Sequence, residues 1–345
     1  MILLAMQLAI LVASCVPTLS APRGEAHLSA LRDARRHFHH GRFDEAAASF
    51  ALAASAAERR VDRDEALYAQ ARSLLRLDRR REALAILDEV AARRPVSRRT
   101  ARALFDSALV RLELGEAERA DSDLERVVRH YPDDGPASRA LWYLLRAREN
   151  QSPQERLRFL SRLYDEVGQH DVGDDLLDAE ADLFLEIGDR AGAVAALERL
   201  VREHAYPHGQ RWDDALVRLA DLAQEDGDHE RAIALLTRLL EPHQRELPPG
   251  TTTLPTMPAA RLRIARIYRD RLHDPVRAAH HFEGVTTQFP ESLLRDDALF
   301  ELGEMWLDGG RRVEGCAMLA RVVREFEVGH ARRLARERHE RDCRE

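Results

Sequence analysis

The chain has 345 residues, of which 45% are hydrophobic, 6% are aromatic and 33% are charged. Its formal net charge is −7, and the sequence contains no lysine, so every Lys/Arg cation is an arginine. Nucleic-acid-binding proteins usually carry a basic surface, so this charge argues against that class. Abundant strong helix formers and a shortage of β-branched or aromatic runs predict an all-α protein.

The first residues are typical of a targeting segment. Ile2 to Val12 form an apolar run that is too short to cross a bilayer as a helix but suits a signal peptide. The stretch Val12-Ala13-Ser14-Cys15 resembles a bacterial lipobox, which implies cleavage before Cys15 and lipid attachment to its sulfur. Val16 in place of Asp implies transfer to the outer membrane. Cleavage after Ser20 without lipid is the alternative. We expect residues 1–21 to be this leader.

The rest of the chain repeats itself. A turn residue followed by a polar stretch, a small residue and an apolar residue recurs at intervals of 36 to 39 residues, with one interval of 46. The turns fall at Gly41, Asp78, Gly115, Gln151, Gly188, Gly227, His273 and Gly310. A sustained period of this length is typical of stacked helical repeats. Glycine at a helix end supplies a positive φ, so each marker should separate two helices.

Within each repeat, apolar residues three and four apart predict two amphipathic helices, which we call helix A and helix B. Small residues occupy corresponding positions on the two helices, where they would allow close approach. On helix A these are Ala34, Ala71, Ala108, Ala181, Ala220 and Gly303; on helix B they are Ala46, Ala83, Ala120, Ala193, Ala232 and Gly315. The fourth repeat departs from the pattern, with Leu144 at the small position.

These small positions, turns and spacings resemble the tetratricopeptide repeat family over residues 27–327. The resemblance implies an α-solenoid with a right-handed superhelix of about eight helix pairs. Tyr206-Pro207 and the run from Gln288 to Ser292 look like repeat ends of periplasmic relatives, including the outer-membrane assembly lipoprotein and Tol–Pal-associated proteins.

We expect repeats 1–6 over residues 27–241, a linker rich in Pro and Thr at 242–258, repeats 7 and 8 at 259–327, and a polar capping helix at 328–345. The sequence leaves open whether Cys316 and Cys343 form a disulfide, because it does not give the distance between their Cα atoms.

In the resembling family, helix A lines a concave groove and its fifth and ninth residues meet the ligand. The corresponding residues are Arg35, Tyr68, Arg72, Phe105, Asp178, Asp182, Asp221, Phe300 and Glu304. These residues predict a groove that is basic near the N-terminus and acidic near the C-terminus, with Tyr68, Phe105 and Phe300 as apolar anchors. The alternative is an ordinary solvated face.

The sequence lacks the patterns of common catalytic and metal sites: no phosphate-binding loop, zinc-protease pattern or nucleophile elbow occurs. We therefore expect no enzyme activity, no cofactor and no metal.

The predicted function is a non-catalytic protein–protein interaction scaffold of the bacterial cell envelope, lipid-anchored at Cys15 on the periplasmic side of the outer membrane, or otherwise secreted to the periplasm. Its partners would be proteins or extended peptide segments, with no nucleic acid and no small-molecule substrate. The alternative function is a cytosolic adaptor that regulates a partner protein. The sequence does not identify the partner, the process or the oligomeric state.

Overall fold

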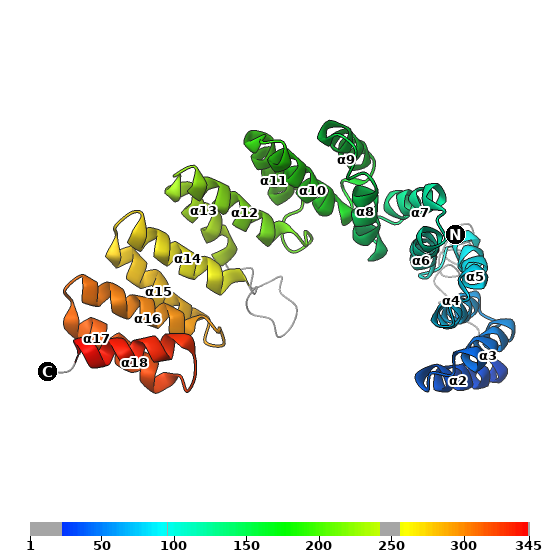
Figure 1. Cartoon of the computed structure of the whole chain (residues 1–345), viewed down its shortest axis with the longest axis horizontal. Helices are drawn as coiled ribbons and strands as arrows, with labels where there is room; N and C mark the ends of the chain where they lie inside the picture. The colour runs from blue at the N-terminus through cyan, green and yellow to red at the C-terminus, as the bar shows by residue number, and fades with distance from the viewer. Residues whose placement is uncertain (1–22, 95, 242–255, 344–345) are drawn as a thin grey trace, which may run out of the picture. The chain divides into compact units, whose positions relative to one another are not determined.

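The computed structural model describes residues 23–94, 96–241 and 256–343 (Figure 1). This part of the chain contains seventeen α-helices and no strand, which confirms the all-α solenoid class. The chain divides into two compact units, residues 1–150 and 151–345, which we call unit 1 and unit 2. The expected leader, including Cys15, lies outside the described residues.

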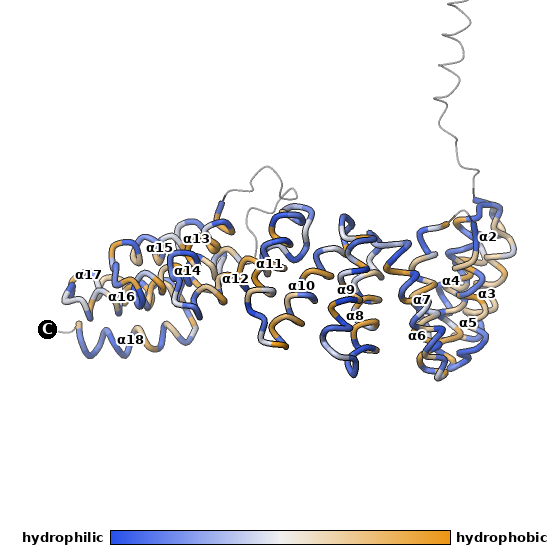
Figure 2. The backbone as a smooth tube through the Cα atoms, turned by 90° about the horizontal axis from the view of Figure 1, so that it is seen from above, coloured by the Kyte–Doolittle hydropathy of each residue, from blue (hydrophilic) through white to orange (hydrophobic). Residues whose placement is uncertain are grey.

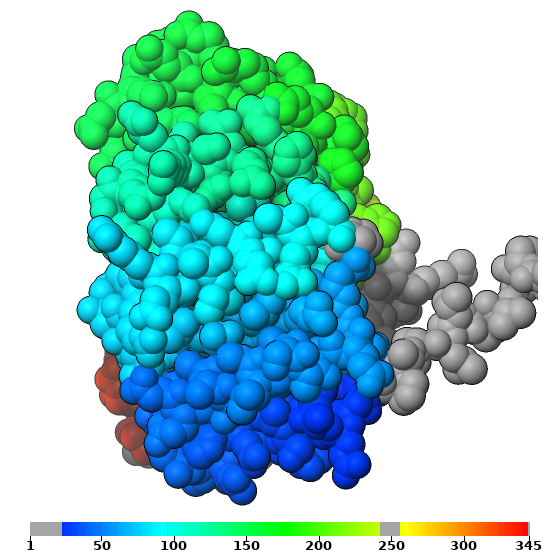
Figure 3. Space-filling view, turned by 90° about the vertical axis from the view of Figure 1, so that its right-hand side faces the viewer, coloured from blue at the N-terminus to red at the C-terminus, as the bar shows by residue number. Residues whose placement is uncertain are grey.

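Unit 1 consists of helices that pack on their neighbours in chain order, and Figure 3 shows them as successive bands from blue through cyan into green. They are α2 (Glu25–His39), α3 (Phe43–Ser55), α4 (Arg60–Arg76), α5 (Arg80–Ala92), α6 (Thr100–Glu113), α7 (Ala117–His130) and α8 (Pro136–Ala147). Unit 2 continues with α9 (Pro153–Val167), α10 (Val172–Glu186), α11 (Arg190–Glu203), α12 (Trp212–Glu225), α13 (His229–Leu240), α14 (Thr256–Asp270), α15 (Pro275–Gln288), α16 (Arg295–Asp308), α17 (Arg312–Glu325) and α18 (His330–Asp342).

All eight predicted markers lie between two helices, and seven of them have a positive φ. Gly41, Gly115, Gly188, Gly227 and Gly310 have φ between 73° and 80°, in the left-handed region that glycine adopts without strain. Asp78 and His273 occupy the same region with φ of 62° and 50°. The marker at Gln151 has no positive φ. There, Ser152 instead starts α9 with a capping box to Glu155.

Helices B of unit 2 often begin with an aspartate directly after the turn. The side chains of Asp189, Asp228 and Asp274 accept hydrogen bonds from backbone N–H groups three residues later, at 2.8 to 3.0 Å. Such caps satisfy donors that the helix itself leaves unpaired. A left-handed residue followed by a capping aspartate thus ends one helix and starts the next.

The small residues lie where helix A crosses helix B, as predicted. All ten alanines of the two sets have no exposed surface. At the last crossing, a Cβ on Gly315 would lie 2.9 Å from the carbonyl oxygen of Gly303 and 2.9 Å from the backbone nitrogen of Leu307. The two backbones are therefore too close for any side chain at that position.

The hydropathy of the chain follows this packing. Figure 2 shows hydrophobic stretches alternating with hydrophilic ones along most helices, while turns and α18 are mostly hydrophilic. α14 begins at Thr256, so the last residues of the expected 242–258 linker are helical, and 242–255 lie outside the described residues. The expected division into repeats 1–6 and 7–8 stays a prediction. The division between units 1 and 2 falls inside the fourth repeat, the one with Leu144 at the small position.

Candidate binding site

Unit 1 contains a cavity of about 550 Å³ on the side formed by α4 and α6. Its lining consists of Tyr68, Arg72, Leu75, Arg76, Arg80, Arg99, Arg102, Asp106, Leu109, Val110 and Glu113. We call this the arginine cavity. Arg72 and Arg76 are four residues apart on α4, so the helical period places both on one face. Arg99 and Arg102 stand at the start of α6, opposite them.

Most of these arginines are held by carboxylates. Arg80 binds Glu113 at 2.6 Å, Arg99 binds Glu65 at 2.7 Å, and Arg102 binds Asp106 at 3.2 Å. Arg72 and Arg76 are exposed and have no carboxylate partner within the described part of the chain. Two guanidinium groups of the cavity therefore remain available to an anion from outside.

Aromatic rings of the first repeat orient these two arginines. The guanidinium carbon of Arg72 lies 5.8 Å from the ring centre of Phe38, and that of Arg76 lies 5.9 Å from Phe43. A cation over a ring face is attracted by its quadrupole, so each side chain has a preferred position without being neutralised. Both cations keep their donors for a ligand.

Tyr68 lies between the two sides of the cavity. It is only 5% exposed, its hydroxyl donates to Asp106 at 2.6 Å, and Arg99 lies 4.9 Å from its ring centre. Burial, together with the neighbouring carboxylate of Asp106, raises the pKa of Tyr68 to about 12. Tyr68 therefore stays neutral and fixes Asp106 as an acceptor beside Arg102.

A smaller cavity of about 210 Å³ adjoins the first and shares Tyr68, Arg72 and Arg99 with it. Arg35 of α2 lines it and, like Arg72, has no carboxylate partner among the described residues. Together the two cavities are lined by eight arginines and four carboxylates. This local excess of positive charge contrasts with the net charge of −7 on the whole chain.

The structure thus brings together three of the predicted groove residues, Arg35, Tyr68 and Arg72. It corrects the role of Phe105, which has no exposed surface and therefore cannot anchor a partner. Helix α8, the helix A of the following repeat, explains this burial. Its Arg139 lies 4.8 Å from the ring centre of Phe105, and its Tyr143 packs edge-on against the same ring. Tyr68 is likewise mostly buried, so its ring is not an exposed apolar anchor, and its hydroxyl donates to Asp106.

The predicted acidic residues of unit 2 are not free charges. Arg218 binds both Asp178 and Asp182, the latter at 2.5 Å, and Arg263 binds Asp221 at 2.5 Å. Each arginine lies on the helix A that follows its acidic partner. This ladder of ion pairs neutralises most of the acidic stretch that the sequence indicated.

The remaining predicted residues lie on α16. Phe300 packs against the core at the end of unit 2, so only part of its ring is exposed. Glu304 lines a separate cavity of about 490 Å³ with Arg269, Asp270, Glu301, Met305 and Asp308. Arg338 of α18 lies 3.7 Å from Glu304. The predicted groove residues of unit 2 thus belong to a surface where most carboxylates have cationic neighbours.

The sequence pattern did not predict several cavity residues, notably Arg76, Arg99 and Arg102. The family pattern points only to set positions of helix A, whereas these arginines lie one turn later or at the start of the next helix A. Two features of the sequence would have indicated the cluster. Arg72 and Arg76 are four residues apart on one helix, and Arg98 and Arg99 stand just before the helix A of the following repeat.

Within residues 23–94, 96–241 and 256–343, no three His, Cys, Asp or Glu side chains come together in a way that could hold a metal ion. In the same described ranges, no helix has the length and apolar character needed to cross a membrane.

Comparison with known proteins gives a family match for two stretches of the chain. Residues 68–135 and 179–251 match the model of a tetratricopeptide repeat family. These stretches extend from α4 to α7 and from α10 to α13, and they are similar to tetratricopeptide repeats, as the sequence resemblance implied. Such repeats serve as scaffolds for protein–protein interaction, with the concave surfaces of stacked helices available to a partner. No curated protein matches the sequence.

Several solved structures show similarity to this chain. A tetratricopeptide repeat protein from Parabacteroides merdae is 16% identical, with 80% of this chain and 98% of that chain covered and a TM-score of 0.36. The C-terminal part of a repeat protein from Cytophaga hutchinsonii is 13% identical, with 88% and 98% covered and a TM-score of 0.39. A human IFIT1 dimer with m7Gppp-AAAA is 16% identical, with 91% and 80% covered and a TM-score of 0.39.

Proposed function

We propose that this protein is a non-catalytic scaffold of the bacterial cell envelope that holds an acidic segment of a partner protein in the arginine cavity of unit 1. The single observation that carries the binding role is the pair Arg72 and Arg76, two exposed guanidinium groups without carboxylate partners, among the described residues, in a cavity of about 550 Å³. A guanidinium presents a planar fork of donors that matches a carboxylate, so each can take one acidic side chain.

The lining of the cavity favours a peptide over other anions. Leu75, Leu109 and Val110 lie among the arginines and would contact an apolar side chain. Asp106 and Glu113 interrupt the positive surface. Their carboxylates would repel the closely spaced phosphates of a nucleic-acid backbone. A peptide segment with one acidic residue on either side of an apolar residue carries its negative charges apart from each other. It therefore fits a lining in which arginines alternate with apolar residues and carboxylates.

Two features that involve cysteine support an envelope location. The Cys15 motif resembles a lipobox, and several acyl chains on that residue would anchor the chain stably. In unit 2, Cys316 and Cys343 form a disulfide with Cα atoms 5.6 Å apart. Disulfides persist in oxidising compartments such as the bacterial periplasm and are rare in the cytosol. We therefore propose lipid anchoring at Cys15 on the periplasmic side of the outer membrane.

The binding role is tested with a labelled peptide in which two glutamates flank a leucine, and with its counterpart carrying arginines in place of glutamates. Fluorescence anisotropy should show binding of the acidic peptide only. Replacing Arg72→Gln and Arg76→Gln together should weaken binding by about tenfold or more, because two charge-assisted contacts are lost. The matched control replaces Arg32→Gln and Arg81→Gln, two exposed arginines outside the cavity, and should bind as the wild type does. Equal binding of both peptides, or an unaffected cavity variant, would overturn the proposal.

The location is tested by fractionating a Gram-negative host that expresses the full chain or its Cys15→Ala variant. We expect the wild type in the outer membrane and the variant in the soluble periplasm. If both are soluble in the periplasm, the lipid anchor is wrong. If both stay in the cytosol, the envelope location is wrong, and the peptide experiment alone decides whether the binding role stands.

A further inference from the structure

The last helix of unit 2 is attached to the solenoid by little apolar surface. α18 packs on α17 and α16, but its only fully buried residues are Ala331 and Ala335. By contrast, α16 buries Ala298, Leu299, Leu302 and Gly303. Burial of apolar area is the main attraction between helices, and two alanine side chains supply little of it.

The polar contacts of α18 with its neighbours are also weak. Arg338 binds Asp308 of α16 at 2.7 Å, but the side chain of Asp308 is 67% exposed. Arg332 reaches the carbonyl oxygen of Val323 at 3.3 Å. Exposed ion pairs contribute little, because water and salt screen them. These contacts orient α18 without fixing it firmly.

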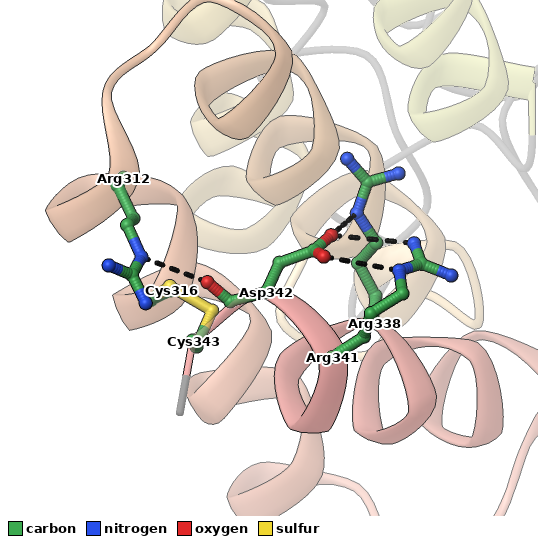
Figure 4. Close-up of a disulfide and its surroundings, with 6 residues drawn as sticks. All are labelled: Arg312, Cys316, Arg338, Arg341, Asp342 and Cys343. Atoms are coloured by element: carbon green, nitrogen blue, oxygen red, sulfur yellow. Dashed lines mark hydrogen bonds and ion pairs between the residues drawn. A yellow bond between two sulfur atoms is a disulfide. The ribbon is translucent and has the colours of Figure 1, made fainter. Parts of the chain in front are cut away.

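A covalent bond holds the far end of the helix. Figure 4 shows the disulfide between Cys316 of α17 and Cys343, the residue that follows α18, beside a 2.9 Å hydrogen bond from Arg312 to the carbonyl oxygen of Asp342. The bridged residues are 27 positions apart. A cross-link over a loop of that length favours the closed state by roughly a few hundredfold through chain entropy alone.

We propose that α18 is a redox-controlled lid, closed over the end of α16 and α17 while Cys316 and Cys343 are bridged and released when they are reduced. This inference goes beyond the proposed function and does not depend on the arginine cavity. Both cysteine residues are partly exposed, so the bridge lies near the protein surface.

The step needs a dithiol reductant. One of its thiolates attacks a sulfur of the bridge and forms a mixed disulfide, and its second thiol then displaces the protein sulfur. The reductant leaves as a disulfide, having supplied two electrons. Cys316 and Cys343 each end as a thiol with one proton. The reverse step, with a disulfide oxidant, closes the lid again.

Release of the lid would change the surface of unit 2. Leu299, Leu319 and Val322 form an apolar cluster with Ala335 of the lid, and Phe326 packs against it. Without α18, these side chains face solvent and form a surface to which another helix can bind. Glu304 and Asp308 also lose Arg338, the cation that α18 contributes. The reduced protein therefore gains an apolar surface with an acidic margin.

Hydrogen–deuterium exchange of the full chain, with and without dithiothreitol, tests the lid. We expect amides of residues 330–342 to exchange at least tenfold faster after reduction, while α10 to α16 keep their protection. Cys343→Ser should give fast exchange in both conditions. Arg338→Gln with the bridge intact is the matched control, and should exchange within a fewfold of the oxidised wild type.

Three results would overturn the proposal. Exchange in residues 330–342 could be unchanged by reduction, which would mean that non-covalent contacts hold α18. The Arg338→Gln variant could open the helix as fully as Cys343→Ser does. Reduction could also remove protection throughout α10 to α18, which would make the disulfide a general support of unit 2 and not the closure of a lid.

Discussion

At the scale of single residues, Glu65 lines the smaller cavity of unit 1 and binds Arg99, which lines both cavities. It accepts hydrogen bonds from Arg98 at 2.6 Å and from Arg99 at 2.8 Å, and its side chain is 24% exposed. Burial opposes ionisation of this carboxyl, but the two guanidinium groups outweigh it and lower the pKa of Glu65. Its negative charge is therefore part of the folded structure.

This gives a prediction with a defined pH dependence. A carboxyl whose pKa is lower in the folded state stabilises the fold above its unfolded pKa, and this contribution is lost as the pH falls. We expect Glu65→Gln to lower the free energy of unfolding by about 1 kcal/mol at pH 7, and by clearly less at pH 3. Urea unfolding at the two pH values measures both.

Glu82→Gln is the matched control, because Glu82 also pairs with an arginine, Arg79, but is 58% exposed. Its effect should be clearly smaller than that of Glu65→Gln at pH 7, because water screens an exposed ion pair. An effect of Glu65→Gln that is equal at both pH values would contradict the electrostatic explanation.

The sequence predicted which residue types face the surface of unit 1, but not how they pair. Arg35, Tyr68 and Arg72 were found because the repeat register places them on helix A. Glu65 binds Arg98 and Arg99, which follow on the chain after α5, and such pairing depends on distances between helices that the sequence does not give. Phe105 was assigned to the surface for the same reason, since the register does not show that α8 covers it.

At the scale of helices, the crossing of α16 and α17 depends on having no side chain at Gly315. An added Cβ would meet the Leu307 nitrogen and the Gly303 oxygen at 2.9 Å, and backbone atoms cannot move aside easily. We expect Gly315→Ala to lower the free energy of unfolding of unit 2 by about 1–3 kcal/mol, despite the better helix propensity of alanine. Thermal or urea unfolding monitored by circular dichroism measures it.

The control for this change is Gly135→Ala, at the N-terminus of α8. Gly135 has a φ of −50°, which any residue adopts, and nothing lies within 4 Å of the position that an added Cβ would take. It should leave stability within about 0.5 kcal/mol. A Gly315→Ala variant as stable as the wild type would mean that α16 and α17 can move slightly apart without a loss in the free energy of unfolding.

Helices and turns were the features best predicted from sequence. A left-handed residue and a small residue five positions later are local requirements, so they leave a readable period, as at Gly227 and Ala232. The disulfide could not be predicted in the same way. It depends on α18 folding back over α17 after Gly329, whose φ is 133°, and no period marks that reversal.

At the scale of the whole chain, unit 1 should fold without unit 2. It has its own apolar clusters, including Ala34, Ala46 and Phe50, and repeat proteins gain stability from contacts between neighbouring repeats. We expect a fragment of residues 23–150 to be helical and to unfold cooperatively in urea, as measured by circular dichroism.

A fragment of residues 23–113 is the matched control. It ends with α6 and lacks α7, so Ala108 and the rest of that crossing are left uncovered, and it should be less stable than residues 23–150. A longer fragment that is no more stable than the shorter one, or that is unfolded, would contradict the independence of unit 1. The sequence did not predict this division, because it gave only a degenerate repeat around Leu144.

The positive charge of the arginine cavity comes from guanidinium groups, and this has a consequence for the release of a partner. Arginine side chains stay protonated at any physiological acidity, whereas histidine side chains do not. A partner held there through carboxylates would remain bound when the surroundings acidify to about pH 5, still above the ordinary pKa of Asp and Glu. Rising ionic strength would weaken it instead, since mobile ions screen exposed charges. Salinity, and not acidity, is thus the external condition that would govern release from this surface.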